Sequence, residues 1–142
     1  MKKTRPQRVD WDQIARFFQG ASRKLATARK ILVIDEEACF QQAYEAMLKA
    51  SLALMLSHGT RPRSLPGHHV VIIEFAGKQL GGAYGELISL FDRMRRKRNL
   101  ALYDVKGFIS RLDAERALQT AVEYLAVVRD QIRRRHPQKQ LF

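Results

Sequence analysis

Residues 35–58 carry the pattern that most constrains the fold of this chain. Side chains recur at spacings of three and four along two neighbouring stripes of one helix. The first stripe contains Phe40, Ala43, Met47, Ala50 and Leu54, and the second contains Tyr44, Leu48, Ser51 and Met55. A helix that is apolar around so much of its girth must be covered on several sides. With Asp35 as its cap and Gly59 as its end, this segment is predicted to be the central helix of a bundle.

Four more segments are predicted to be helices that supply this cover. The first starts after the N-cap Asp10, and its stripe contains Ile14, Phe18, Ala21, Leu25, Ala28 and Leu32. Residues 68–80 include "VVII", but a lone strand would have no partner, so a helix is predicted there as well. A fourth helix carries Leu87, Phe91 and Met94. The last starts at Ser110 or Asp113 and runs to about Arg135, with a stripe of Leu118, Val122, Leu125 and Val128/Arg129.

These segments predict an all-α, up-and-down bundle of about five helices. Residues 10–135 are predicted to form a single domain, residues 1–9 a flexible basic arm and residues 136–142 a basic tail. Residues 60–67 are predicted to be a turn-rich loop, "GGAYGE" a break between helices, and residues 104–107 a connector.

The charge of the chain bears on its partners. Lysine and arginine number 26 against 14 aspartates and glutamates, which gives a formal net charge of +12. RNA or an acidic partner protein fits this charge best, and a merely solvated basic surface is the alternative. The single cysteine, Cys39, excludes an intrachain disulfide and is expected to be a small buried side chain. The start of the chain is not typical of a secretory signal, and the longest apolar run, "LALML", is too short to cross a bilayer, so we expect a cytoplasmic protein.

The stretch "DRMRRKRNLALYD", residues 92–104, points to a functional site. The inward stripe of the fourth helix continues from Met94 to Arg98, where an apolar residue is expected. An unpaired buried guanidinium is costly, so Arg98 should face a crevice, a subunit interface or an anion. Arg95, Asn99 and Leu102/Tyr103 lie on the neighbouring line. Arg93, Arg96 and Lys97 lie around the other faces, where they would be solvated or would attract nucleic acid generally. The alternative for the whole run is a basic last turn that complements the helix dipole.

The sequence resembles the HEPN family of small helical domains over most of its length. The resemblance lies in "AYEAMLKASLALMLSHGTRPR", in "GHHVVIIEF" and above all in "RRKRNLALYD". It implies a homodimer with both copies of the motif at the interface, and RNA cleavage without a metal. The usual motif is an arginine, often followed by Asn or Asp, and then a histidine four to six residues on; Arg98 and Asn99 match its start.

Tyr103 stands where the motif histidine is expected, and the next histidine is His136. This ending resembles a branch of the family whose members often sit beside a nucleotidyltransferase. Pairs of this kind form toxin and antitoxin, and in some the transferase adds AMP to a motif tyrosine. Histidine, with a reference pKa of about 6.5, suits acid–base catalysis, whereas tyrosine at about 10 is a poor base. Arg98 and Arg95 can still supply positive charge to a phosphate.

Other polar clusters are weaker indicators of a site. His68 and His69 open the third helix and His58 precedes them, but a metal site needs more converging ligands, so a packing or interface role is expected for the pair. The resembling family often carries a histidine here too. The "GGAYG" turn lacks the strand and the Gly-Lys ending of a phosphate loop. We expect no cofactor and no bound metal.

These observations predict the toxin-like component of a HEPN/nucleotidyltransferase pair that cleaves RNA without a metal. Arg98, Asn99 and Tyr103 are the predicted catalytic residues, and Arg95, Arg96, Arg98 and Lys97 are the predicted contacts to phosphate or RNA. The alternative is a binding module without catalysis, which dimerises and holds a nucleotidyltransferase or a nucleotide, with Tyr103 as a contact or AMP acceptor. A plain helical adaptor is the third possibility.

Overall fold

The computed structural model of the chain describes residues 3–63, 67–103 and 109–137. It contains α1 (Trp11–Ile31), α2 (Glu36–Ser57), α3 (His68–Leu80), α4 (Gly85–Tyr103) and α5 (Arg111–Arg135). A 3-10 turn, η1 (Gly82–Tyr84), joins α3 to α4, and two short strands, β1 (Thr4–Pro6) and β2 (Thr60–Pro62), complete the fold. The predicted all-α bundle is thus confirmed. The connector at residues 104–107 and most of the basic tail lie outside the described residues.

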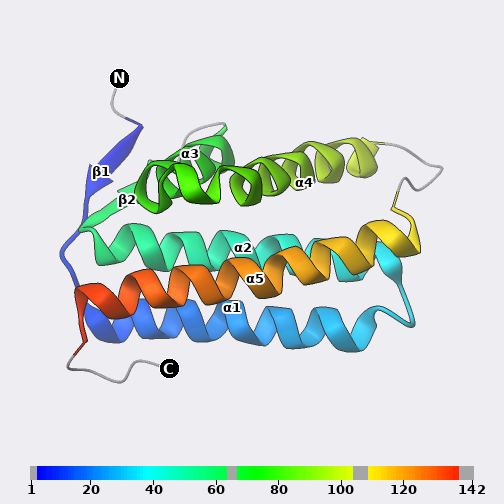
Figure 1. Ribbon diagram of the computed structural model, residues 1–142, viewed down its shortest axis with the longest axis horizontal. Helices are drawn as coiled ribbons and strands as arrows, with labels where there is room; N and C mark the ends of the chain where they lie inside the picture. The colour runs from blue at the N-terminus through cyan, green and yellow to red at the C-terminus, as the bar shows by residue number, and fades with distance from the viewer. Residues whose placement is uncertain (1–2, 64–66, 104–108, 138–142) are drawn as a thin grey trace.

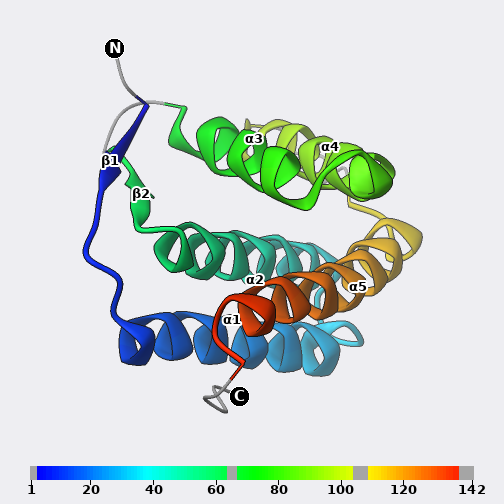
Figure 2. The same cartoon turned by 60° about the vertical axis from the view of Figure 1, so that its left-hand side comes forward.

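The helices form layers around α2 (Figure 1). The pair α1 and α5 packs against one side of α2, while α3 and α4 cover the other, as a second view also shows (Figure 2). Both predicted stripes of α2 are buried, and its neighbour-facing residues include Cys39, which has no exposed surface. The prediction of a central helix is therefore confirmed. No helix in the described part of the chain has both the length and the apolar character needed to cross a membrane.

The helix starts follow their local sequence. Asp10 accepts a hydrogen bond from the Asp12 backbone N–H at 3.0 Å, and Asp35 accepts one from Ala38 at 3.0 Å. Ser110 and Asp113 form a reciprocal capping box at the start of α5. These caps satisfy backbone donors that have no partner within the helix, so the predicted starts are confirmed.

The inward face of α5 differs from the predicted stripe. Ala114, Ala117, Ala121, Tyr124, Leu125, Val128 and Ile132 are buried. Val122 is 37% exposed, so its assignment to the inward stripe was wrong. Alanines let two helices approach closely. We infer that the alanines let α5 approach α2 closely, while the larger side chains of Tyr124, Leu125, Val128 and Ile132 fill the buried space beside them.

Residues Thr4–Pro6 do not belong to an isolated arm. Thr4–Pro6 pairs antiparallel with Thr60–Pro62, and Arg5 lies opposite Arg61. Gln7 adds a backbone hydrogen bond of 2.9 Å to the carbonyl of Gly59, whose φ of +71° suits glycine. The predictions of a loose arm at residues 1–9 and a turn-rich loop at residues 60–67 are corrected for the paired residues. The pairing joins segments far apart in the sequence, so no local sequence pattern predicts it.

Candidate functional site

Arg98, the motif arginine, lies on α4 against the central helix. Its Nε donates a hydrogen bond to Oε1 of Gln41 at 3.1 Å, and its guanidinium carbon lies 5.6 Å from the centre of the Tyr44 ring. The side chain is partly buried, and among the described residues no carboxylate lies within ion-pair distance of it. Arg98 is therefore held in place by a neutral amide and an aromatic face, and its charge is not neutralised by an acid.

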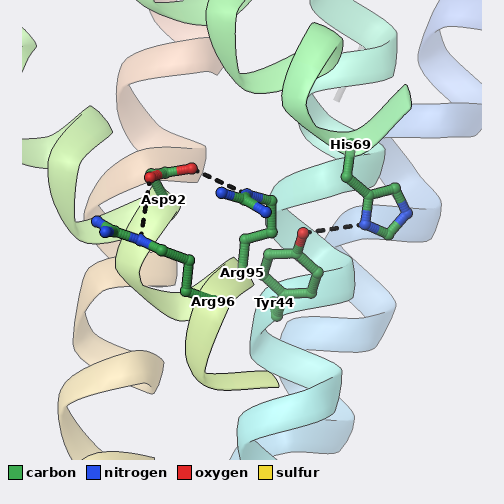
Figure 3. A network of polar contacts seen from close by, with 5 residues as sticks. All are labelled: Tyr44, His69, Asp92, Arg95 and Arg96. Atoms are coloured by element: carbon green, nitrogen blue, oxygen red, sulfur yellow. Dashed lines mark hydrogen bonds and ion pairs between the residues drawn. The ribbon is translucent and has the colours of Figure 1, made fainter. Parts of the chain in front are cut away.

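Arg95 lies one turn before Arg98 and is fixed differently. Its Nε donates to Oδ1 of Asp92 at 2.9 Å, and the other oxygen of Asp92 lies 3.3 Å from Nε of Arg96 (Figure 3). The Arg95 side chain is only 21% exposed. A single carboxylate thus orients two arginines on α4, and only Arg95 is turned toward the start of α3.

A surface pocket of about 220 Å³ lies between the start of α3 and α4. Its lining residues are Gly67, His68, His69, Val70, Arg95 and Asn99. None of these described lining residues is acidic. The pocket therefore offers positive charge and hydrogen-bond donors to a ligand, which suits an anion.

His69 connects this pocket to the core. Its Nδ1 lies 3.0 Å from the Tyr44 hydroxyl (Figure 3). Burial raises the pKa of Tyr44 to about 12, although the nearby Arg98 and Arg95 partly oppose this. Burial also lowers the pKa of His69, and the positive charges of His68, Arg98 and Arg95 lower it further. At neutral pH the Tyr44 hydroxyl thus keeps its proton and His69 stays uncharged.

The remaining predicted residues lie elsewhere on α4. Tyr103 is 88% exposed, and five residues of helix place it roughly 140° around the axis from Arg98. Asn99 joins Arg95 at the pocket. Lys97 instead pairs with Asp113 at the start of α5, with Nζ 3.0 Å from Oδ2. Arg93, Arg96, Lys97 and Leu100 line a separate surface hollow of about 510 Å³.

Within one chain, the structure thus brings Arg95, Asn99 and the two α3 histidines together, with Arg98 behind them against Tyr44. It does not bring Tyr103 or Lys97 to the same place. Tyr44, Gln41 and Asp92 were not predicted from the sequence as parts of this cluster. Tyr44 could have been included from the sequence, because a tyrosine on a buried stripe needs a hydrogen-bond partner for its hydroxyl and so predicts a polar residue nearby. No such pattern points to Gln41.

The arrangement of the histidine, cysteine and carboxylate side chains bears on metal binding. Within residues 3–63, 67–103 and 109–137, no group of three or more histidine, cysteine, aspartate or glutamate side chains converges as metal ligands would. His58 contacts the Phe75 ring edge-on, with ring centroids 5.7 Å apart, and does not join His68 and His69.

Comparison with known proteins gives one family match. A family model of the HEPN domain matches residues 14–131, a span that takes in all five helices wholly or in part. Curated proteins yield no significant match. The family match covers most of the chain and agrees with the helical bundle, with α2 at its centre and the arginine-rich segment on α4. The chain therefore belongs to the HEPN domain family.

Proposed function

We propose that this protein binds RNA at the α3–α4 edge of the bundle and cleaves it without a metal, as the toxin-like component of a HEPN/nucleotidyltransferase pair. One observation carries the proposal: Arg98 is held by Gln41 and the Tyr44 ring, without a carboxylate partner among the described residues, on a chain of net charge +12. A fixed guanidinium without a counter-charge is suited to a phosphate that gains negative charge in the transition state.

In the proposed reaction the ribose 2′-oxygen attacks the adjacent phosphorus, and the bond from phosphorus to O5′ breaks. The products are a 2′,3′-cyclic phosphate and a 5′-hydroxyl. A base removes the 2′ proton, and O5′ receives a proton as it leaves. Arg98 and Arg95 stabilise the charge on the phosphate oxygens, and Asn99 positions the group.

Cleavage of end-labelled RNA by the purified protein in EDTA tests this proposal. Arg98→Ala should reduce cleavage by about 100-fold or more, because one well-placed donor contributes on that order to the transition state. Arg29→Ala removes the same charge from an exposed position at the end of α1 and should leave the rate nearly unchanged. Equal loss in both variants, or cleavage that EDTA abolishes, would contradict the proposal.

The exposed position of Tyr103 favours a second candidate function. A hydroxyl at 88% exposure, at the end of α4, is open to an incoming enzyme and lies away from the Arg98 side. The alternative is therefore a binding module that dimerises and holds a nucleotidyltransferase, with Tyr103 as its contact or AMP acceptor. Tyr103→Phe distinguishes the two: it should leave RNA cleavage intact if the tyrosine is only an acceptor, and should abolish AMP incorporation by a paired transferase.

The toxin-like role has its own test. Induced expression in a bacterial host should arrest growth, and Arg98→Ala expressed to the same level should not. Co-expression of a partner nucleotidyltransferase should restore growth to cells that carry the wild-type chain. Arrest that persists with Arg98→Ala would separate toxicity from the proposed site.

A further inference from the structure

The hydrogen bond from the Tyr44 hydroxyl determines which ring nitrogen of His69 carries a proton and can donate it in the pocket. Tyr44 has no exposed surface, and in the described part of the chain its hydroxyl has one hydrogen-bond partner, Nδ1 of His69. A buried hydroxyl donor without an acceptor costs free energy, so the tyrosine must donate and the imidazole must accept. His69 then carries its proton on Nε2.

The charge state of His69 follows from the same contact. Protonation would place a hydrogen on Nδ1, and this nitrogen could then no longer accept the hydrogen bond from the Tyr44 hydroxyl. The neighbours that act on this ring are His68 from α3 and Arg95 and Arg98 from α4, and each of them lowers the pKa of His69 further below the value that burial sets. The nearby carboxylate of Asp92 is held by Arg95. His69 is therefore a neutral imidazole whose Nε2–H can only donate.

His68 has the complementary property. Its ring stands edge-on to that of His69, with centroids 4.7 Å apart, and lines the same pocket from an exposed position. Among the residues that the structure describes, no hydrogen bond engages its nitrogens. Unlike Nδ1 of His69, both ring nitrogens of His68 are thus open to a ligand in the pocket.

We propose that the pocket formed by His68, His69, Arg95 and Asn99 binds a phosphodiester of RNA, with His69 as a fixed neutral donor and His68 as the base. The imidazole that the family motif carries on α4, where this chain has Tyr103, is then supplied from α3. This inference rests on the proposed ribonuclease function and names the site that performs it. His68 takes the 2′-hydroxyl proton as the bond from O2′ to phosphorus forms, and the departing O5′ takes a proton from water, to which the exposed pocket is open.

The arrangement of the pocket supports phosphate over a carboxylate or a cation. Asp92 holds Nε of Arg95, which leaves the remaining guanidinium N–H groups for a ligand. Asn99 adds an amide, and the first residues of α3 contribute the positive end of its dipole. Donors thus line several sides of the pocket, as an oxyanion with several oxygens requires.

Nitrogen NMR of the histidine side chains tests the binding site without any need for catalysis. His69 should appear as the neutral Nε2–H tautomer, and Tyr44→Phe should convert it to a mixture of tautomers and raise its pKa. Titration with inorganic phosphate, and then with an uncleavable 2′-O-methyl RNA oligonucleotide, should shift the signals of His68, His69 and Arg95 Nε. The signals of His136, which stacks on Trp11 at 4.2 Å, should not move. A His69 found as the Nδ1–H tautomer, or phosphate shifts centred on Arg93 and Lys97, would overturn the assignment.

Affinity for the same oligonucleotide gives a second measure. Arg95→Gln should weaken binding by about 10-fold or more, because a charge-assisted hydrogen bond contributes on that order, and the matched Arg29→Gln should change it little. Equal weakening in the two variants would mean that only overall charge matters, and the pocket assignment would fail.

Cleavage by His68→Gln separates this inference from the proposed function. The variant should still bind the oligonucleotide but lose about 100-fold in cleavage, while His136→Gln should cleave normally. Cleavage by His68→Gln at the wild-type rate would overturn the assignment of His68 as the base and leave the ribonuclease proposal standing. The wild-type protein could also cleave no RNA while phosphate shifts the NMR signals of His69 and Arg95. The phosphate site would then stand, and both the ribonuclease proposal and the role of His68 as a base would be wrong.

Discussion

Two buried tyrosine hydroxyls have different partners and different roles. Tyr44 reaches His69 at the edge of the pocket, whereas Tyr124 lies 2.6 Å from Oγ of Ser51 in the interior. Ser51 donates its own proton to the carbonyl of Met47 at 2.8 Å, so Tyr124 must be the donor in this pair. Burial raises the pKa of Tyr124, so this donor keeps its proton at neutral pH.

This direction of the hydrogen bond predicts unequal effects of two substitutions. Ser51→Ala leaves a buried O–H donor without an acceptor and should lower the free energy of unfolding by about 2 kcal/mol. Tyr124→Phe leaves only an oxygen lone pair unused and should cost about 1 kcal/mol. Urea unfolding measures both. The double variant should cost no more than Ser51→Ala alone, and an additive result would mean that the two hydroxyls act independently.

His69 predicts how stability depends on pH. Its pKa in the folded protein lies below the ordinary 6.5, so below that pH the unfolded chain binds the extra proton more readily than the folded one. The stability contributed by the neutral imidazole should therefore be full above about pH 6.5 and be lost as the pH drops from there to the lower pKa of the folded state. His58, whose pKa is also lowered by burial and by Arg135, acts in the same direction.

Thermal unfolding between pH 8 and pH 5 measures this dependence. His69→Gln keeps an acceptor for the Tyr44 hydroxyl and removes the titration, so its melting temperature should fall less over this range than that of the wild-type protein. His136→Gln serves as the control. A wild-type melting temperature that rises between pH 7 and pH 5 would mean that the protonated imidazole is favoured in the fold, contrary to the contact with Tyr44.

At the scale of helices and strands, the sequence predicted well what is decided locally. The helices beginning after Asp10, Asp35 and Ser110 were identified because each cap acts on the first turn that follows it. The β1–β2 ribbon was missed because three-residue strands have no pattern of their own. On α5 the sequence pattern identified Leu125 and Val128 correctly, but it placed the exposed Val122 inward and overlooked the buried alanines, because it weighs large aliphatic residues whereas close approach of two helices selects alanine.

The candidate site divides in the same way. Helical spacing placed Arg98 on the inward side and Arg95 beside Asn99, since both follow from 3.6 residues per turn. The contacts to Gln41, Tyr44 and His69 could not be derived, because they depend on how α3 and α4 lie across α2. A pattern on one helix cannot say which residues of another helix it meets.

The capping box at Ser110 allows a prediction for α5. Ser110→Ala removes the acceptor that receives the Asp113 N–H at 3.0 Å, and should destabilise the protein by about 1 kcal/mol. Ser110→Asp retains an acceptor and should keep most of the stability. Chemical denaturation followed by circular dichroism distinguishes the two. Equal losses in both variants would show that the start of α5 does not depend on this cap.

At the scale of the molecule, the apolar residues near the end of α4 bear on self-association. Leu100, Leu102 and Leu112 are 63%, 51% and 54% exposed in the single chain. Exposed apolar groups of this kind mark contacts with partners. We predict a homodimer, and Leu100→Glu combined with Leu102→Glu should convert it to a folded monomer, as measured by sedimentation. Val33→Glu, at a residue that is 75% exposed in the turn after α1, should remain a dimer. A wild-type protein that sediments as a monomer at high concentration would contradict the prediction.

The burial of Cys39 makes its reaction rate a measure of local opening of the fold. This thiol is the single one in the sequence, it has no exposed surface, and burial raises its pKa although Arg111 partly opposes this. Arg111 begins α5 and its charge acts on this thiol, so we expect a reagent to reach the sulfur when the start of α5 separates from α2. The rate of modification by a disulfide reagent therefore reports the frequency of that opening as one exponential phase, under native conditions and without any added label.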